Sequence, residues 1–414
     1  MSDIALIKIT GRDRVGVTST VTGILDAASA SILDIGQAVI HNNLVLGMLV
    51  ELPASESPEH AALVEQLTDR LAEMGMEMTF ELVQSDSYAR WINRQGKPRH
   101  ILTLLARKIS AAHVSAVTSL AAKHKLNIDK ITRLSGRVHV ADELERGAAF
   151  DIQRSDKACV EFSLRGELPN EQLVREELLE LSRRLDIDIA YQEDDMFRRN
   201  RRLVVFDMDS TLIEAEVIDE LARVAGVGEE VAAITEAAMR GELNFQESFI
   251  KRVSLLKGLE ASHLQEVADG LKMTEGAEIL ISTLRRLGYK TAILSGGFTF
   301  FARQLQEKLG VDYMYANDLD TENGVVTGKV VSTIVDGERK AELLKKIAAK
   351  EGIALQQVIA VGDGANDLPM LGIAGLGVAY RAKPLVRESA RQSISTLGLD
   401  SILYLLGISD RELG

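Results

Sequence analysis

Apolar residues near the start of the chain follow the spacing of a strand and then that of a helix. The run Ile4–Ile9 is typical of a strand, and the apolar residues that follow a polar turn recur at helical spacing. The same reasoning extends to residue 82, with His41-Asn42-Asn43 as a short turn. The predicted elements are strands at 4–9, 32–40, 44–52 and 76–82 and helices at 17–25 and 58–74. Their order is βαββαβ.

The order recurs after a polar bridge at 84–99. Strands are expected at 101–105, 128–134, 158–164 and 186–190, with helices beginning near 111 and 169. A long polar insertion, Ala141–Asp156, separates the middle strands of this copy, and we expect a mobile loop there. Both copies correspond to the α+β ferredoxin-like arrangement, so we predict one such domain over residues 1–85 and a second over 100–193.

Beyond a charged connector at 193–202, the pattern changes to short, fully apolar strands that alternate with helices. Such strands are typical of a parallel sheet covered on both faces. We therefore predict a third, α/β domain with a doubly wound parallel sheet over 200–414. A helical insertion at about 217–271 follows its first strand, and we expect it to form a cap.

The net charge of the chain limits the classes of molecule that it is expected to bind. The chain has 414 residues, with 48 Lys and Arg against 61 Asp and Glu, so its net charge is −13. An acidic chain repels a phosphate backbone, which argues against nucleic acid and against an anionic membrane surface. An anionic substrate would need local positive charge or a metal ion.

The cysteine content and the N-terminal residues indicate in which cellular compartment the protein is expected. Cys159 is the single cysteine, which excludes an intrachain disulfide and a multi-cysteine zinc site. The first residues show no basic segment followed by a long apolar stretch, and no later stretch reaches about 18 uninterrupted apolar residues. We expect a cytoplasmic protein, with Cys159 as a buried strand residue.

Polar residues follow three of the apolar strands of the third domain. They are Asp207-Met208-Asp209-Ser210-Thr211, Ser295-Gly296-Gly297 and Gly362-Asp363-Gly364-Ala365-Asn366-Asp367. Carboxyl ends of parallel strands meet at one edge of a sheet, where open α/β folds place their ligand site. Neighbouring carboxylates repel one another, and a hard divalent cation resolves that conflict. Oxygen ligands without Cys or His favour Mg²⁺.

These three motifs, with Lys340 between the second and the third, closely resemble those of the haloacid dehalogenase superfamily of phosphatases, and within it the phosphoserine phosphatases. The resemblance covers about 202–407. It implies that Asp207 is the nucleophile and Asp209 the general acid and base, roles that suit phosphate-ester hydrolysis through an aspartyl phosphate. It also implies that Ser295 and Lys340 hold the phosphoryl group. The expected metal ligands are Asp207, Asp209, Asp363 and Asp367.

The same resemblance implies a substrate site shared between the cap and the sheet. Its expected contacts are Glu216, Met239, Phe245, Arg252, Ser295, Gly296, Lys340 and Asn366. O-Phosphoserine carries an ammonium and a carboxylate besides its phosphate, so Glu216 and Arg252 form a complementary pair. By themselves, Arg252 would be a surface charge and Phe245 a core residue, and Glu216 would be an ordinary acid in the first turn of a helix.

The two N-terminal domains resemble ACT domains, regulatory modules that often bind amino acids. The loop Gly11–Gly16 fits the family's first-loop pattern, except that Val15 replaces the usual proline. The corresponding loop of the second copy, 107–112, has neither glycine nor acid. We expect Asp13, Gly16 and Asp34 to bind an amino-acid effector, L-serine, although a simple glycine turn is an equal alternative. Exposed sheet edges would pair across a homodimer.

Taken together, these features predict a Mg²⁺-dependent phosphatase for O-phospho-L-serine, acting in the last step of serine synthesis and regulated by serine. One alternative is a related phosphatase or phosphotransferase for another small phosphomonoester. A second is an amino-acid-sensing interaction protein whose hydrolase domain is incidental.

Overall fold

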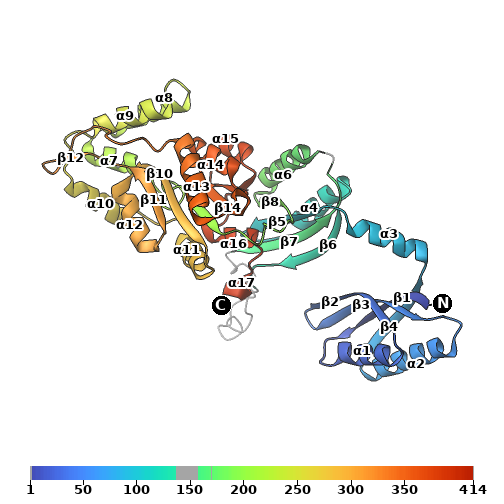
Figure 1. Ribbon diagram of the computed structural model, residues 1–414. Coiled ribbons are helices and arrows are strands. Elements are labelled where there is room, and N and C mark those ends of the chain that lie inside the picture. The colour runs from blue at the N-terminus through green and yellow to red at the C-terminus, as the bar shows by residue number, and fades with distance from the viewer. Residues whose placement is uncertain (1, 137–156, 169, 414) are drawn as a thin grey trace, which may run out of the picture. The chain divides into compact units, whose positions relative to one another are not determined.

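The computed structural model describes residues 2–136, 157–168 and 170–413, and side chains of these residues except that of Met239. The chain divides into two compact units, Met1–Lys97 and Pro98–Gly414. Figure 1 shows the elements with their labels. In the described part of the chain, no helix is both long enough and apolar enough to cross a membrane.

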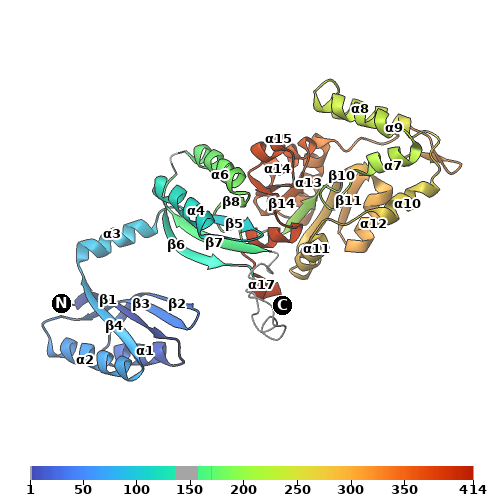
Figure 2. The ribbon, with the colours of Figure 1, turned by 180° about the vertical axis from the view of Figure 1, so that it is seen from behind.

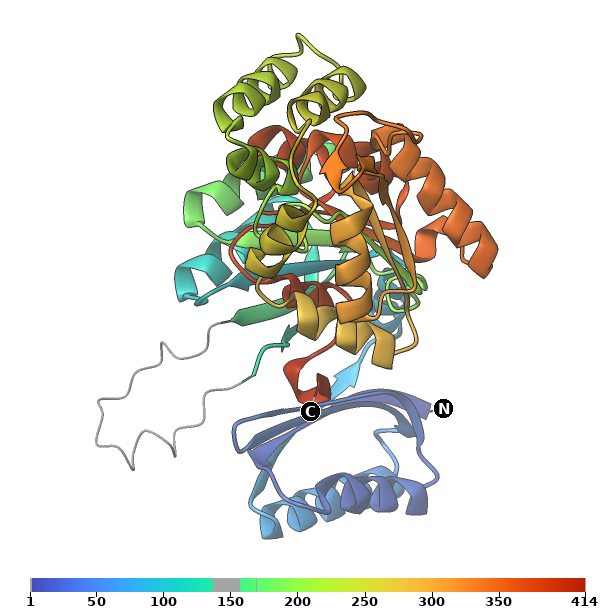
Figure 3. The same ribbon diagram turned by 90° about the vertical axis from the view of Figure 1, so that its left-hand side faces the viewer.

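The first unit contains the predicted βαββαβ fold. Its elements are β1 (Ser2–Arg12), α1 (Val17–Ala27), β2 (Ser31–Ile40), β3 (Asn43–Pro53), α2 (Pro58–Glu73), β4 (Met76–Val83) and α3 (Ser85–Gln95). The four strands form an antiparallel sheet in the order β2-β3-β1-β4. Figure 3 shows α1 and α2 in blue on one face of this sheet. Alternate residues of β1, such as Ile7 and Ile9, point toward these helices and are fully buried.

Two features of the first unit differ from what the pattern suggested. The segment 84–99, expected as a polar bridge, contains α3, a helix with no buried residue. Strand β2 lies at the sheet edge, and all ten of its residues are exposed although several are apolar. Ile32, Ile35, Val39 and Ile40 are between 42% and 73% exposed.

The second unit begins with the second copy of the fold. Its elements are β5 (Arg99–Ala106), α4 (Ala111–Lys123), β6 (Asn127–Arg133), β7 (Ala158–Arg165), α6 (Glu171–Leu185) and β8 (Asp188–Glu193). The sheet order β6-β7-β5-β8 repeats that of the first copy strand for strand. Figure 2 shows α4 and α6 on one face of this sheet. The predicted loop Ala141–Asp156 lies outside the described residues.

The rest of the second unit is the predicted doubly wound domain. Its strands form one parallel sheet in the order β11-β10-β9-β14-β15-β16, with a separate two-stranded hairpin of β12 and β13. The strands are β9 (Leu203–Phe206), β10 (Lys290–Phe298), β11 (Tyr313–Asn317), β12 (Thr321–Glu322), β13 (Val325–Val326), β14 (Val358–Gly362), β15 (Leu376–Tyr380) and β16 (Gln392–Ile394).

Helices cover both faces of this sheet, as the fully apolar strands predict. In β9, Val204 and Phe206 pack toward α11 and α12, whereas Leu203 and Val205 pack toward α13 and α14. All four side chains are fully buried. The helices of this domain are α11 (Ala277–Arg286), α12 (Thr299–Leu309), α13 (Gly337–Glu351), α14 (Leu368–Ile373), α15 (Pro384–Ser389), α16 (Ile402–Leu405) and α17 (Asp410–Leu413).

Four helices inserted between β9 and α11 form the cap. They are α7 (Val217–Ala225), α8 (Gly228–Met239), α9 (Phe245–Leu255) and α10 (Ser262–Gly270). Figure 1 shows them in yellow-green to yellow beside the parallel sheet. Helix α9 begins with a capping box in which Asn244 and Glu247 each bond the other's backbone amide.

The second ferredoxin-like domain packs directly against the parallel-sheet domain. Its Leu105, Leu134 and Cys159 belong to the same hydrophobic core as α16. Asp188 on β8 accepts hydrogen bonds from Ser395 N at 2.8 Å and from Thr396 N and Oγ1 at 2.7 Å. Cys159 is fully buried, as expected for a structural strand residue.

Candidate active site

The three polar motifs meet at one edge of the parallel sheet. Strand β9 lies between β10 and β14, and Phe206 is in register with both Ile293 and Val361. The backbone N–H of Asp207 donates to Val361 O at 2.9 Å. Asp207 therefore leaves its strand level with the residues that begin the other two motifs.

Three carboxylates gather at this edge. Each of Asp207, Asp363 and Asp367 offers an oxygen within 4.8 Å of the other two, which is the spacing of a metal site. The carboxylate of Asp209, which the sequence also placed among the metal ligands, is not part of this group. A set of carboxylate oxygens without nitrogen or sulfur suits Mg²⁺.

Lys340 reaches this cluster from the first turn of α13. Its side chain is fully buried, and Nζ lies 2.8 Å from Asp207 Oδ1 and 2.7 Å from Asp367 Oδ1. Burial alone would lower the pKa of Lys340, but the two carboxylates raise it on balance. Lys340 is therefore a permanent cation that bridges two acids.

Asp367 is held on both sides of its carboxylate. Oδ1 accepts from Lys340 Nζ, and Oδ2 accepts from the backbone amides of Asp363 at 3.1 Å and Gly364 at 2.9 Å. A Cβ added at Gly362 would lie 2.4 Å from the Asp367 carboxyl carbon, so only glycine permits this approach. The geometry makes Asp367 a fixed support of the cluster.

One lysine does not neutralise these acids. Burial, followed by the charge of Asp367, raises the pKa of Asp207 well above its ordinary value. The same two causes raise the pKa of Asp363 to about 7. A divalent cation would favour the charged carboxylates, so the donor set fits such an ion on electrostatic grounds as well.

Asp209 lies apart from that group, with an environment that favours its protonated form. One oxygen, Oδ1, accepts from Val217 N at 3.0 Å, which ties it to the start of α7. Burial, and then the charge of Glu216, raises the pKa of Asp209 to about 8. A carboxyl group that keeps its proton at neutral pH can donate it.

The Ser295 motif is the third of the three motifs that meet at this edge of the sheet. Ser295 is fully buried, and its Oγ accepts from Gly297 N at 2.8 Å, which leaves the hydroxyl hydrogen available. A Cβ added at Gly297 would lie 2.4 Å from Asp209 Oδ2. A Cβ at Gly296 would lie 2.9 Å from Phe245 Cζ, which places the cap against this strand end.

The cap brings an acid and a guanidinium to the same region. Glu216 accepts from Ser210 Oγ at 2.9 Å, and burial raises its pKa. Burial lowers the pKa of Arg252, while the charges of Glu216 and Asp219 oppose that effect. Arg252 Nε is buried and has no hydrogen-bond partner among the described residues. That unsatisfied donor suits a ligand carboxylate.

The remaining expected contacts vary in their placement. Phe245 is partly buried in a stack with Phe249, with ring centroids 6.2 Å apart. Asn366 is half-buried in the turn before α14. Met239 is the last residue of α8, and its side chain lies outside the described part of the structure.

Sequence reasoning did not assign roles to two residues that support the site. Thr211, fully buried, lies 3.3 Å through Oγ1 from Asp363 Oδ1 and belongs to the motif that begins at Asp207. Gln246 in α9 donates to Asp336 Oδ2 at 2.6 Å and so connects the cap to the start of α13. Thr211 could have been found from its motif, whereas no sequence spacing indicates the contact of Gln246.

The expected regulatory residues occupy two elements of the first unit. Asp13 and Gly16 lie in the loop before α1, where Gly16 adopts a left-handed conformation with φ 99°. Asp34 lies in the exposed strand β2, and its Oδ1 accepts from Ile35 N at 2.9 Å. Asp13 and Asp34 are both exposed.

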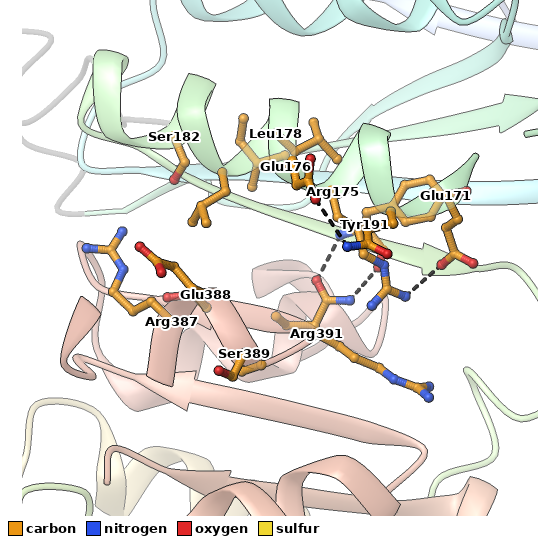
Figure 4. A pocket seen from close by; sticks show the side chains of 16 residues that line it. Glu171, Arg175, Glu176, Leu178, Ser182, Tyr191, Arg387, Glu388, Ser389 and Arg391 are labelled. Atoms are coloured by element: carbon orange, nitrogen blue, oxygen red, sulfur yellow. Dashed lines mark hydrogen bonds and ion pairs between the residues drawn. The ribbon is translucent and has the colours of Figure 1, made fainter. Parts of the chain in front are cut away.

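A separate depression of about 620 Å³ lies elsewhere in the second unit, between α6 and residues 387–393 (Figure 4). Figure 4 shows Arg175 paired with Glu171 along its rim. None of the catalytic motifs lines it. The chemistry described above therefore belongs to the strand ends and not to this depression.

Comparisons with known proteins agree with this division. Residues 204–372 match the family of haloacid dehalogenase-like hydrolases, and residues 3–81 match the ACT domain family. The chain is 40% identical to a phosphoserine phosphatase of Streptomyces coelicolor over 408 residues, which cover 98% of this chain and 93% of that protein. It is 39% identical to one of Mycobacterium tuberculosis, with 99% and 94% covered.

Solved structures give the same result. A crystal structure of a probable phosphoserine phosphatase from Vibrio cholerae matches with a TM-score of 0.58 and 31% identity, covering 77% of this chain and 93% of that one. A haloacid dehalogenase family hydrolase from Salmonella enterica matches with a TM-score of 0.62 and 29% identity, covering 75% and 99%. The motifs, the fold and the near full-length relatives together show that this chain belongs to the phosphoserine phosphatase family of haloacid dehalogenase-like hydrolases, with an ACT domain at its N-terminus.

Proposed function

We propose that this protein hydrolyses O-phospho-L-serine to L-serine and phosphate, the last step of serine biosynthesis. The observation that carries the proposal is a buried carboxylate cluster, braced by Lys340, beneath a cap that presents Glu216 and Arg252. The names of the near full-length relatives support the same substrate.

Asp207 is the proposed nucleophile. Lys340 Nζ and the backbone N–H of Met208, at 2.7 Å, hold its carboxylate in one orientation. Attack forms a bond from an Asp207 oxygen to phosphorus and breaks the bond from phosphorus to the seryl oxygen. The first product is L-serine, and the phosphoryl group remains on Asp207 as an acyl phosphate.

Asp209 moves the proton in both steps. In the first it gives its proton to the departing seryl oxygen, which the raised pKa of about 8 makes possible at neutral pH. In the second it takes a proton from the water that attacks phosphorus and breaks the acyl phosphate. Ser295 Oγ–H and Lys340 stabilise the phosphoryl oxygens.

Mg²⁺ is the proposed cofactor, held through Asp207 and Asp363. Both oxygens of Asp367 already accept hydrogen bonds, so we assign it the supporting role, and the carboxylate of Asp209 bonds the cap instead. When bound, the ion would neutralise the carboxylates and offset negative charge on the phosphoryl oxygens.

Specificity for an amino-acid ester comes from the cap. The unsatisfied Nε of Arg252 is suited to the substrate carboxylate, and Glu216 to its ammonium. Phe245, packed against Gly296, would exclude water from the phosphoryl group. Met239 and Asn366 complete the proposed contacts.

The first domain is the proposed site of regulation and self-association. Free amides at the start of α1 would bind the carboxylate of L-serine, with Asp13, Gly16 and Asp34 as the proposed contacts. The exposed apolar edge strand β2 favours pairing with a second copy, as a homodimer. A single buried thiol is consistent with a cytoplasmic location.

A phosphate-release panel tests the proposal. O-Phospho-L-serine, O-phosphothreonine and a sugar phosphate would be compared with and without Mg²⁺, in the wild type, in Asp207→Asn and in Asp318→Asn as an exposed control. We expect phosphoserine to be the fastest substrate and to be hydrolysed only when Mg²⁺ is present. Of the three proteins, only Asp207→Asn should fail to hydrolyse it. Faster turnover of another ester would overturn the assigned substrate.

A further inference from the structure

Two short chain segments connect the cap to the parallel-sheet domain. The segment at 212–216 leads into α7, and the segment at 271–275 returns from α10. They pair with each other: Glu214 N donates to Lys272 O at 2.9 Å, and Thr274 N donates to Leu212 O at 3.0 Å. Because the whole cap lies between these segments, we call this two-stranded ladder the hinge.

Two acidic side chains on the hinge share one arginine. Arg381 Nη2 lies 2.9 Å from Glu275 Oε2, and Nη1 lies 3.8 Å from Glu214 Oε1. Arg381 follows the end of β15 directly, and its backbone N donates to Ile394 O at 2.7 Å. The guanidinium is thus anchored to the sheet and reaches both segments of the hinge.

The second ferredoxin-like domain contributes another arginine. Arg107 lies in the loop between β5 and α4, and its Nη1 and Nη2 donate to the two oxygens of Glu275 at 2.9 and 2.7 Å. This two-pronged geometry fixes direction as well as distance. The corresponding loop of the first domain contains Asp13 and Gly16, which are proposed to bind the effector.

The ferredoxin-like domain that carries Arg107 is itself fixed to the parallel-sheet domain by hydrogen bonds. Gln392 accepts from Tyr191 N at 2.9 Å and donates to Tyr191 O, which joins the edges of the two sheets. Tyr404 Oη donates to Asp410 at 2.7 Å, and Asp410 N donates to Leu134 O at 3.0 Å. A shift of this domain would therefore move Arg107 and pull on Glu275.

We propose that Arg107 is a positioning residue for the reaction, one that holds the cap hinge in the closed arrangement through Glu275. The cap is closed in this structure, because Phe245 lies against Gly296 and Gln246 bonds Asp336. Only the choice of assay substrate rests on the proposed function. The proposal also explains why the loop at 107–112 lacks the glycine and acid of its counterpart: it binds the hinge.

Kinetics with a matched control give the first test. In Arg107→Ala we expect kcat/KM for phosphoserine to fall about threefold to fivefold, mainly through KM, because the pair is partly exposed and the open cap becomes more populated. Arg107→Lys should recover only part of the loss, because an ammonium restores the positive charge but not the two parallel hydrogen bonds of a guanidinium. The control, Arg183→Ala, removes an exposed ion pair with Glu388 that joins the same two domains away from the hinge. It should leave KM unchanged.

Hydrogen exchange gives a second readout that needs no substrate. The amides of Glu214 and Thr274 should exchange faster in Arg107→Ala than in the wild type or Arg183→Ala, because both amides bond within the hinge. Equal effects of the two variants, or no change in exchange and KM, would overturn the inference. If the wild type fails to hydrolyse phosphoserine but the exchange difference appears, the proposed substrate falls and the hinge role stands.

Discussion

Replacing Lys340 with methionine tests the electrostatic account of the site. The ammonium is fully buried and lies 2.8 Å from Asp207 and 2.7 Å from Asp367. Methionine is unbranched and apolar, so it fills a similar space but removes the charge. Two buried carboxylates are then left facing each other without their cation.

The expected loss of stability follows from that geometry. Removing one partner of a buried ion pair costs about 3–5 kcal/mol. For a domain of this size, each kcal/mol lowers the melting temperature by about 2–4 °C, which gives a drop of about 6–20 °C. Mg²⁺ should restore part of this loss, because it supplies positive charge to the same carboxylates.

The expected loss of activity has a rate and a pH component. Removing one preorganised cation from a transition state costs about 100- to 1000-fold in kcat. Lys340 opposes the burial and the neighbouring acids that raise the pKa of Asp207, so without Lys340 that pKa rises further. Because Asp207 attacks only when ionised, the acidic limb of the activity profile should move to higher pH.

Phosphate release would be measured from about pH 5 to pH 9 with Mg²⁺, together with thermal unfolding. Lys345→Met is the matched control, since Lys345 is exposed on the same helix. We expect the control to behave as the wild type. An unchanged rate and an unmoved acidic limb in Lys340→Met would show that the ammonium does not support the charge of Asp207.

Three further predictions concern the cap, the strand end and the hinge. Arg252→Ala should raise KM for phosphoserine about 10- to 100-fold but leave KM for phosphoethanolamine, which lacks the carboxylate, nearly unchanged; equal effects on both would contradict the assignment. Gly297→Ala should abolish turnover in steady-state assays while circular dichroism stays native, because the added Cβ would lie 2.4 Å from Asp209 Oδ2; retained activity would refute this. The hydrogen bond from Arg107 lowers the pKa of Glu275 below its ordinary value of 4.5, so its stabilisation is present above that pH and lost as the pH falls through the lowered value. The melting-temperature difference between wild type and Glu275→Gln should therefore be largest near neutral pH and vanish in strong acid; a constant difference would argue against the ion pair.

The sequence predicts those parts of the fold that have a regular apolar period. Alternate burial in β1 and complete burial of β9 follow directly from their residues, and both sheets lie where these patterns place them. Helix α3 was missed although Tyr88, Trp91 and Ile92 recur at helical spacing, because this short apolar stripe lies among polar residues and none of it is buried. The exposure of β2 could not be predicted either, because an apolar strand at the edge of a sheet has the same sequence pattern as one in its middle.

The site was predictable where residues follow strands. Asp207 and Asp363 meet because their strands are neighbours, which the parallel pattern implies. The bridge from Lys340 to Asp367 depends on how α13 packs, and no spacing encodes it. The contact of Arg107 with Glu275 joins residues 168 positions apart, and only the docking of two domains reveals it.

If Asp207 takes the phosphoryl group from the substrate, that group can be trapped on its side chain. The protein would be mixed with O-phospho-L-serine and Mg²⁺, quenched in acid within one turnover, and digested for peptide mass spectrometry. We expect the added mass of one phosphoryl group on Asp207 in the wild type, and no such mass in the Asp207→Asn variant. Turnover without such an adduct, or an adduct on another residue, would contradict it.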